Sequence, residues 1–197
     1  MCFSAQASFI AAGTLTLIGI ATLSKVRSKS ILPFALQPLI FGVQQALEGV
    51  LWLTLPPEHS ANILHSLALY GFLIIACIIW PLWVPYSVYL LEQSSSRRFL
   101  LRITGYTGAV FAIIATTILT IGGAYVYDAS NHIVYAVQPD FYLRYIKPIE
   151  IVTHYIPLAF YCIATIGSLF VASTSGVWLL GVLSLIGFVT AYLGYYL

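Results

Sequence analysis

Charged side chains are scarce in this chain. Its 197 residues include eight Lys and Arg and six Asp and Glu, so that only 7% are charged, against about a quarter in an average soluble domain. A soluble surface cannot be built from so few charges, and soluble globular folds are therefore excluded. The net charge of +2 comes from short clusters between apolar segments, so we predict no nucleic-acid partner.

Cysteine and established catalytic motifs are scarce as well. Cys2, Cys77 and Cys162 are too few and too scattered for a disulfide framework or a paired-cysteine metal motif. The sequence contains no GxSxG, HExxH, Walker or dinucleotide-binding pattern. Any chemistry would have to come from isolated polar residues within the apolar segments.

Long apolar runs are abundant, and 60% of the residues are hydrophobic. Breaking the runs at charges and turn residues gives six spans, near residues 3–24, 31–55, 61–80, 99–126, 147–171 and 176–197. Each is long enough to cross a hydrocarbon core of about 30 Å. We predict an all-α polytopic transmembrane bundle of six spans, one domain over 1–197, with the lipid bilayer around it. The third span continues past Pro81 and Pro85 to Leu91, where we expect a bend or an interfacial end.

Basic residues indicate the orientation of the bundle. Six of the eight fall in two connections on one predicted side: Lys25, Arg27, Lys29, Arg97, Arg98 and Arg102. The positive-inside rule makes that side cytoplasmic, which predicts a multi-pass protein of the inner (plasma) membrane with an extracytoplasmic N-terminus. Trp80, Trp83 and Tyr86 are predicted at the cytoplasmic interface. The connection over 127–146 is polar and aromatic, and we expect an ordered extracytoplasmic cap loop there.

Span two carries polar residues at membrane depth: Gln44, Gln45, Glu48 and Trp52. An ionisable group at the centre of a membrane helix costs about 2.5–3.5 kcal/mol on insertion scales, so each one needs a role. Glu48 lies roughly 10 Å of helix rise from the outer end of its span. We predict that Glu48 faces the bundle interior and that these four residues form a ligand-binding face.

Three more groups share the outer half of the membrane with Glu48. His65 lies near the start of span three, and Glu150 and His154, four residues apart, face the same side of span five. Together these groups could bind zinc, iron, manganese or copper, or relay a proton. Other interpretations stay open: Glu150 complementing its helix dipole, a solvated His65, and a His154 bonded to a neighbouring hydroxyl or carbonyl.

Several segments resemble an uncharacterised family of bacterial multi-span membrane proteins. The matching segments are Met1-Cys2-Phe3-Ser4-Ala5, Gln37-Pro38-Leu39, Gln44-Gln45, Glu48-Gly49, Trp52, and Trp80-Pro81 with Pro85. The resemblance is close over about the first 90 residues, and it implies a further helix after Leu197. It implies no activity, because none is assigned to the family.

Three functions remain open on the sequence. The first is an outward-facing intramembrane Glu/His site that binds a divalent metal or a proton and supports hydrolysis or transport. The second is a non-catalytic accessory or structural subunit, as a homo-oligomer or within a larger membrane complex, which the small size and short loops favour. The third is a small-solute carrier or channel lined by Gln44, Gln45 and Glu48.

Overall fold

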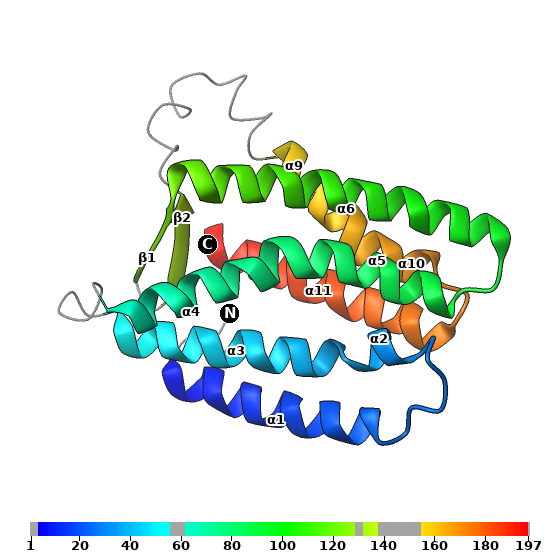
Figure 1. Cartoon of the computed structure of the whole chain (residues 1–197), viewed down its shortest axis with the longest axis horizontal. Helices are drawn as coiled ribbons and strands as arrows, with labels where there is room; N and C mark the ends of the chain where they lie inside the picture. Colours follow the sequence, from blue (N-terminus) through cyan, green and yellow to red (C-terminus); the bar gives the residue numbers. More distant parts are fainter. Residues whose placement is uncertain (1–3, 56–61, 129–131, 138–154, 197) are drawn as a thin grey trace.

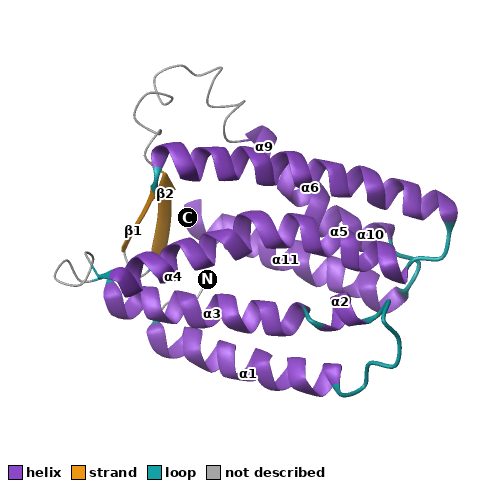
Figure 2. Ribbon diagram, viewed as in Figure 1, coloured by secondary structure: helices purple, strands orange, loops and turns teal. Residues whose placement is uncertain are grey.

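The computed structural model describes residues 4–55, 62–128, 132–137 and 155–196. In this part of the chain, helices lie side by side along the longest axis of the molecule, and a two-stranded hairpin stands at one end (Figure 1, Figure 2). The predicted all-α bundle with six helical segments is confirmed. We call the end with the strands the hairpin end.

Most of the described helices follow the predicted spans; the fourth span differs, and residues 147–154 of the fifth lie outside the described residues. The first half contains α1 (Ala5–Leu23), α2 (Leu32–Ala35), α3 (Gln37–Thr54), α4 (Ile63–Ile74), the π-turn η1 (Ile75–Ile79) and α5 (Trp80–Leu91). The second half contains α6 (Ser95–Gly122), β1 (Ala124–Asp128), β2 (Ile133–Val137), α9 (Ile156–Cys162), the π-turn η3 (Ile163–Gly167), α10 (Ser168–Val171) and α11 (Ser175–Tyr196).

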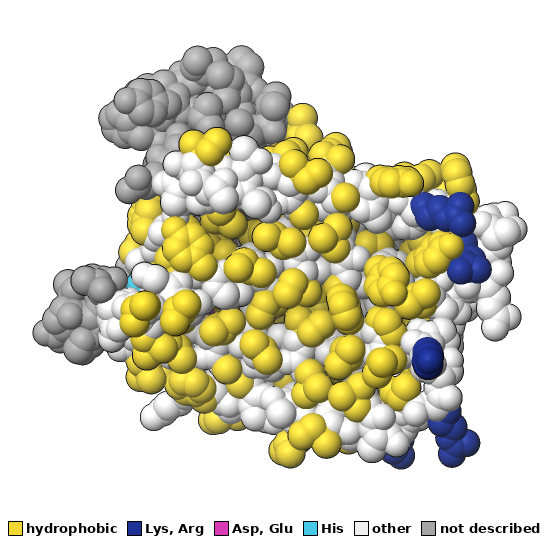
Figure 3. Space-filling model, viewed as in Figure 1, with side chains coloured by type: hydrophobic (Ala, Val, Ile, Leu, Met, Phe, Trp, Pro, Cys, Tyr) yellow, Lys and Arg dark blue, Asp and Glu magenta, His cyan; other side chains and the backbone are white. Residues whose placement is uncertain are grey.

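Three of the described helices are long and apolar enough to cross a membrane. They are Ala5–Leu23, the continuous α4–η1–α5 helix over Ile63–Leu91, and Ser95–Gly122. Figure 3 shows apolar side chains along the visible side of the molecule, with Lys and Arg gathered at the end away from the hairpin. This distribution fits a membrane protein whose sides face lipid.

The basic residues share one end of the bundle, as the sequence predicted. Lys25, Arg27 and Lys29 follow the C-terminus of α1, and Arg97, Arg98 and Arg102 lie in the first two turns of α6. Both places are at the end opposite the hairpin (Figure 1). We call this end, defined by these six residues, the basic end.

The fourth predicted span, 99–126, differs from the structure at both ends. Helix α6 begins at Ser95 and ends at Gly122, and Gly123 has a φ of 66°. Glycine adopts this left-handed conformation without steric cost, which lets the chain leave the helix and turn. Strand β1 begins immediately afterwards and pairs antiparallel with β2. The sequence analysis did not predict these strands.

The hairpin packs on the ends of α3 and α4. Ile133 is buried in a cluster with Leu51, Ala68, Leu69 and Leu73, and the ring of Tyr135 stacks on Phe72 with the centroids 4.4 Å apart. The hairpin therefore covers the C-terminal end of α3 and part of α4.

Helix α1 packs closely along α3. A side-chain carbon at Gly49 would lie 2.8 Å from the Phe9 ring, and one at Gly42 would lie 3.0 Å from Thr16 Oγ1. The two glycines let the helix backbones approach, which strengthens van der Waals contact between membrane helices.

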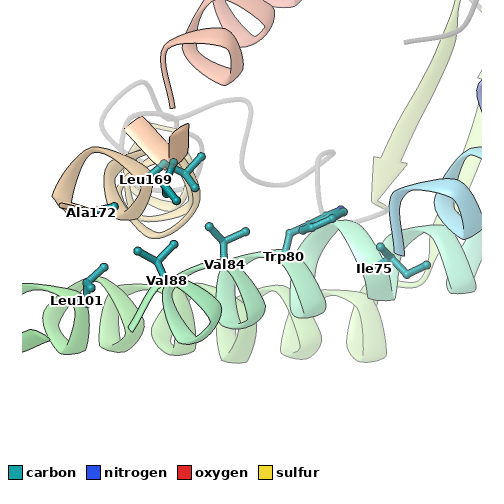
Figure 4. Close-up of a cluster of buried hydrophobic side chains, with 8 residues drawn as sticks. Ile75, Trp80, Val84, Val88, Leu101, Leu169 and Ala172 are labelled. Atoms are coloured by element: carbon teal, nitrogen blue, oxygen red, sulfur yellow. The ribbon is translucent and has the colours of Figure 1, made fainter. Parts of the chain in front are cut away.

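Prolines shape the contact between α5 and α6. Pro85 has no N–H to donate to the carbonyl of Pro81, four residues earlier, and Gly108 of α6 lies directly against that carbonyl. The backbone N–H of Trp80 donates to the carbonyl of Ile75, five residues earlier. This bond forms the π-turn that precedes the prolines. Beside them, α5 residues pack with Leu101, Leu169 and Ala172 in the main apolar core (Figure 4).

Candidate functional site

A row of polar side chains joins α3 to α5. Gln37, Gln44 and Glu48 are spaced seven and four residues apart, so they lie on one face of α3. The Gln37 amide Nε2 donates to Ser87 Oγ at 2.9 Å, and the Trp80 Nε1–H donates to Gln44 Oε1 at 2.6 Å. We call this row the polar seam. Its bonds fix the register between α3 and the α4–η1–α5 helix.

Trp80 belongs to this seam. The sequence analysis placed Trp80 at the cytoplasmic interface, and this prediction is wrong. The indole is buried inside the bundle and hydrogen-bonded to Gln44. Its bond holds the Gln44 amide in one orientation, because the amide oxygen must face the indole N–H.

Glu48 is the ionisable member of the seam, and only 4% of its surface is exposed. The Gln45 amide Nε2 donates to Glu48 Oε2 at 3.0 Å. A neutral amide donor satisfies a carboxylate oxygen without fixing the charge of the carboxyl group. Gln45 therefore holds one carboxyl oxygen of Glu48 in place.

The π-turn η1 lies next to the polar seam. Gln44, one helical turn before Glu48 on α3, bonds to Trp80, which follows η1 directly. Helix α3 also contacts η1. Single π-turns within α-helices occur frequently at functional sites.

His65 lies nearer the hairpin end and bonds to Thr54. The distance between Thr54 Oγ1 and His65 Nδ1 is 2.9 Å. The Thr54 hydroxyl also lies 3.0 Å from the Val50 carbonyl oxygen and 3.3 Å from that of Leu51, either of which can accept its proton. Nε2 makes no hydrogen bond to the part of the chain that the structure describes.

The structure brings together some of the predicted site residues. Gln44, Gln45, Glu48 and His65 are all buried at the α3–α4 side of the bundle. Trp52 is half-buried and packs against the Leu51–Ile133 cluster. His65 bonds to Thr54, six residues beyond Glu48 on α3, rather than to Glu48.

The remaining predicted ligands, Glu150 and His154, lie outside the described residues. Among the residues that are described, no group of three His, Cys, Asp or Glu side chains could hold a metal ion.

Glu92 is a buried carboxylate that the sequence analysis missed. It follows α5 at the basic end and is 6% exposed. Its Oε1 accepts from the N–H groups of Gln93 and Ser94, both at 2.9 Å, and its Oε2 accepts from the N–H of Ser173 at 2.8 Å. Burial alone raises the pKa of Glu92, but these N–H groups outweigh it and hold the pKa below its ordinary value of 4.5. Glu92 therefore joins the connection between α5 and α6 to the connection between α10 and α11.

Ser8 is a second residue without a predicted role. It lies on the face of α1 that packs on α3, with Ala12 and Gly19, and is completely buried. Its hydroxyl has no hydrogen-bond partner among the residues that the structure describes.

An open hollow of about 470 Å³, lined by Ser95, Ser96, Phe99 and Leu100, lies at the basic end of the molecule and is not part of the Glu48 site.

Comparison with known proteins gives the chain a family but no activity. Residues 1–195 match the family described as Family of unknown function (DUF6629), and the chain belongs to that family. Neither a curated protein nor a solved structure matches the chain. This membership agrees with the resemblance drawn from the sequence segments.

Proposed function

We propose that this member of a family of unknown function is a multi-pass membrane protein that binds a proton or a cation at Glu48. The site would lie within the membrane, in the half nearer the hairpin end. The observation that carries the proposal is the buried Glu48 carboxyl group on a polar seam between apolar helices. An ionisable residue inside a membrane is costly and commonly marks an ion or proton pathway.

The neighbours of Glu48 support a built site. Gln44 is held by Trp80, and Gln45 by Glu48 itself, so both amides have fixed orientations. Oxygen ligands that are already oriented lose little entropy when a cation binds. The π-turn η1 ends next to Trp80, the partner of Gln44, and adds backbone there that departs from the regular helical hydrogen-bond pattern.

The distribution of basic residues supports a proposal for the side of the membrane toward which the site opens. The basic end carries Lys25, Arg27, Lys29, Arg97, Arg98 and Arg102, and the positive-inside rule favours a cytoplasmic position for it. We therefore propose that Glu48 and His65 open toward the extracytoplasmic side of an inner (plasma) membrane, and that the N-terminus lies on that side.

Thermal unfolding of the detergent-purified full chain tests this proposal. Wild type, Glu48→Gln and Glu92→Gln would be compared with sodium, magnesium, manganese and zinc, each over a pH series. A bound cation or proton raises the unfolding temperature by mass action. We expect a response in the wild type and Glu92→Gln that is lost in Glu48→Gln. The same response in all three proteins would overturn the proposal and favour a role as an accessory subunit.

His65 supports a second candidate, a divalent-metal site. Its Nδ1 is held by Thr54, and metal-binding histidines are commonly oriented in this way through the ring nitrogen that does not bind the metal. Glu48, Glu150 and His154 would supply the other ligands. Elemental analysis of wild type, His65→Ala and His154→Ala tests it. Near-stoichiometric zinc, iron, manganese or copper in the wild type, lost in both variants, is expected; a metal-free wild type would exclude this site.

A further inference from the structure

Two arginines of α6 share one tyrosine ring at the basic end. The guanidinium carbon of Arg98 lies 4.4 Å from the centroid of the Tyr89 ring, and that of Arg102 lies 5.6 Å from it. Arg102 Nη2 also donates to the Tyr89 hydroxyl at 3.2 Å. Stacking on an aromatic face restricts a guanidinium that would otherwise move freely. Tyr89 of α5 therefore holds two positive charges close together.

Neither guanidinium has a carboxylate partner in the described ranges of the chain. Arg98 and Arg102 form no ion pair with any residue that the structure describes. Glu92 is near in sequence, but its two oxygens accept from the N–H groups of Gln93, Ser94 and Ser173. The buried Nε–H of Arg98 also lacks an acceptor in the described part of the chain. Both charges thus remain available to an external anion.

The position of the arginines favours an anion at the membrane surface. Helix α6 has 28 residues, or roughly 42 Å at 1.5 Å per residue, which exceeds a hydrocarbon core of about 30 Å. Its first two turns can therefore reach the headgroup region. Exposed apolar side chains continue along the adjoining face of the helix: Phe99, Ile103 and Tyr106, the last of them 72% exposed.

We propose that Arg98 and Arg102, held by Tyr89, bind the phosphate of an anionic phospholipid. Arginine binds phosphate through parallel N–H donors, and cations near the membrane surface attract anionic lipid. The exposed face with Phe99 and Ile103 would contact the acyl chains of the same lipid, which a free phosphate ion could not exploit. This proposal depends on the membrane placement of α6 but is independent of the Glu48 site.

Lipid retention by the purified full chain tests the proposal. The protein in detergent would be titrated with phosphatidylglycerol or phosphatidylcholine, and bound lipid counted by native mass spectrometry. Wild type would be compared with Arg98→Gln/Arg102→Gln. The matched control is Lys25→Gln/Lys29→Gln, which removes the same charge from exposed positions at the same end. Unfolding temperatures in phosphatidylcholine would show that each variant is folded.

We expect wild type to retain phosphatidylglycerol in preference to phosphatidylcholine. The arginine variant loses the guanidinium N–H donors that would contact the phosphate, so it should bind phosphatidylglycerol about tenfold more weakly. The lysine control should change by less than about twofold, because Lys25 and Lys29 lie on the connection after α1 and act on the lipid only through a field that salt screens. Equal losses in both variants would mean a diffuse positive field and would overturn the proposal.

A second arm separates the lipid from a soluble anion. Inorganic phosphate would be added to the wild-type protein carrying phosphatidylglycerol, and retention measured again. We expect the lipid to stay bound, because its acyl chains contribute contacts that the ion lacks. Displacement of the lipid by inorganic phosphate would overturn the assignment to phospholipid.

Discussion

Two buried carboxyl groups, Glu48 near the hairpin end and Glu92 at the basic end, differ in the groups that hold them. Their exposed surfaces are similar, at 4% and 6%. Glu92 accepts from three backbone N–H groups, which favour the charged form and join two loops. Glu48 accepts from a neutral amide within a seam of membrane helices. Burial alone therefore does not distinguish a carboxylate that joins loops from one that lies among apolar helices, and the place of each group in the fold has to be considered.

The largest effect is expected from removing the Glu92 carboxylate. Glu92→Ala leaves three N–H groups without their acceptor, and a hydrogen bond to a charged group contributes about 1.5–3 kcal/mol. Water at the basic end can accept from some of these N–H groups in place of the carboxylate, so we expect a loss of about 2–3 kcal/mol in the free energy of unfolding. Reversible chemical unfolding in detergent measures it. Gln93→Ala, an exposed neighbour, is the control and should stay within about 0.5 kcal/mol.

The pH dependence of stability tests whether the three N–H groups favour the charged form of Glu92. The pKa of folded Glu92 is below its ordinary value of 4.5, so its stabilising contribution is present above that value and is lost as the pH falls through the folded pKa. The difference in unfolding temperature between wild type and Glu92→Gln should be constant at neutral pH and shrink in acid. A difference that grows on acidification would contradict the role assigned to the three N–H groups.

A smaller effect is expected from the seam beside Glu48. Trp80→Phe removes the donor to Gln44 Oε1, and interhelical hydrogen bonds in membranes contribute about 0.6 kcal/mol on average and up to about 1.7 kcal/mol. A double-mutant cycle of Trp80→Phe with Gln44→Leu should give a coupling energy of about 1 kcal/mol. Additive single effects would mean that the 2.6 Å contact does not stabilise the seam.

The smallest effect is expected from Ser8→Ala. The buried Ser8 hydroxyl lacks a partner among the described residues, so its removal leaves no donor or acceptor unsatisfied. The free energy of unfolding should change by less than about 0.5 kcal/mol, or increase. A loss above about 1 kcal/mol would show that the hydroxyl is hydrogen-bonded in the membrane-embedded protein.

Apolar runs were sufficient to predict the bundle, because a membrane helix must keep about 20 apolar residues together. They could not predict β1: residues Ala124 to Val126 continue the apolar run of α6, and a short apolar segment suits a helix or a strand equally. Gly123, with its positive φ, was the local signal for the end of the helix.

The candidate site was predictable in part. Glu48 and His65 stand out because ionisable residues are so rare in the apolar spans. Trp80 was misplaced because tryptophan is common at membrane interfaces, and only its contact with Gln44, 36 residues away, reveals its role. Glu92 was missed for a similar reason: Ser173, which completes its binding, is 81 residues away.

The most direct test of the Glu48 site is infrared difference spectroscopy of the carboxyl groups in detergent-purified wild type, Glu48→Gln and Glu92→Gln. The C=O stretch of a protonated carboxyl group would be followed while the pH or the cation is changed. The account predicts a responsive band in the wild type and Glu92→Gln that is missing in Glu48→Gln. A wild type and a Glu48→Gln variant that respond alike, or a wild type that does not respond, would contradict a proton or cation site at Glu48.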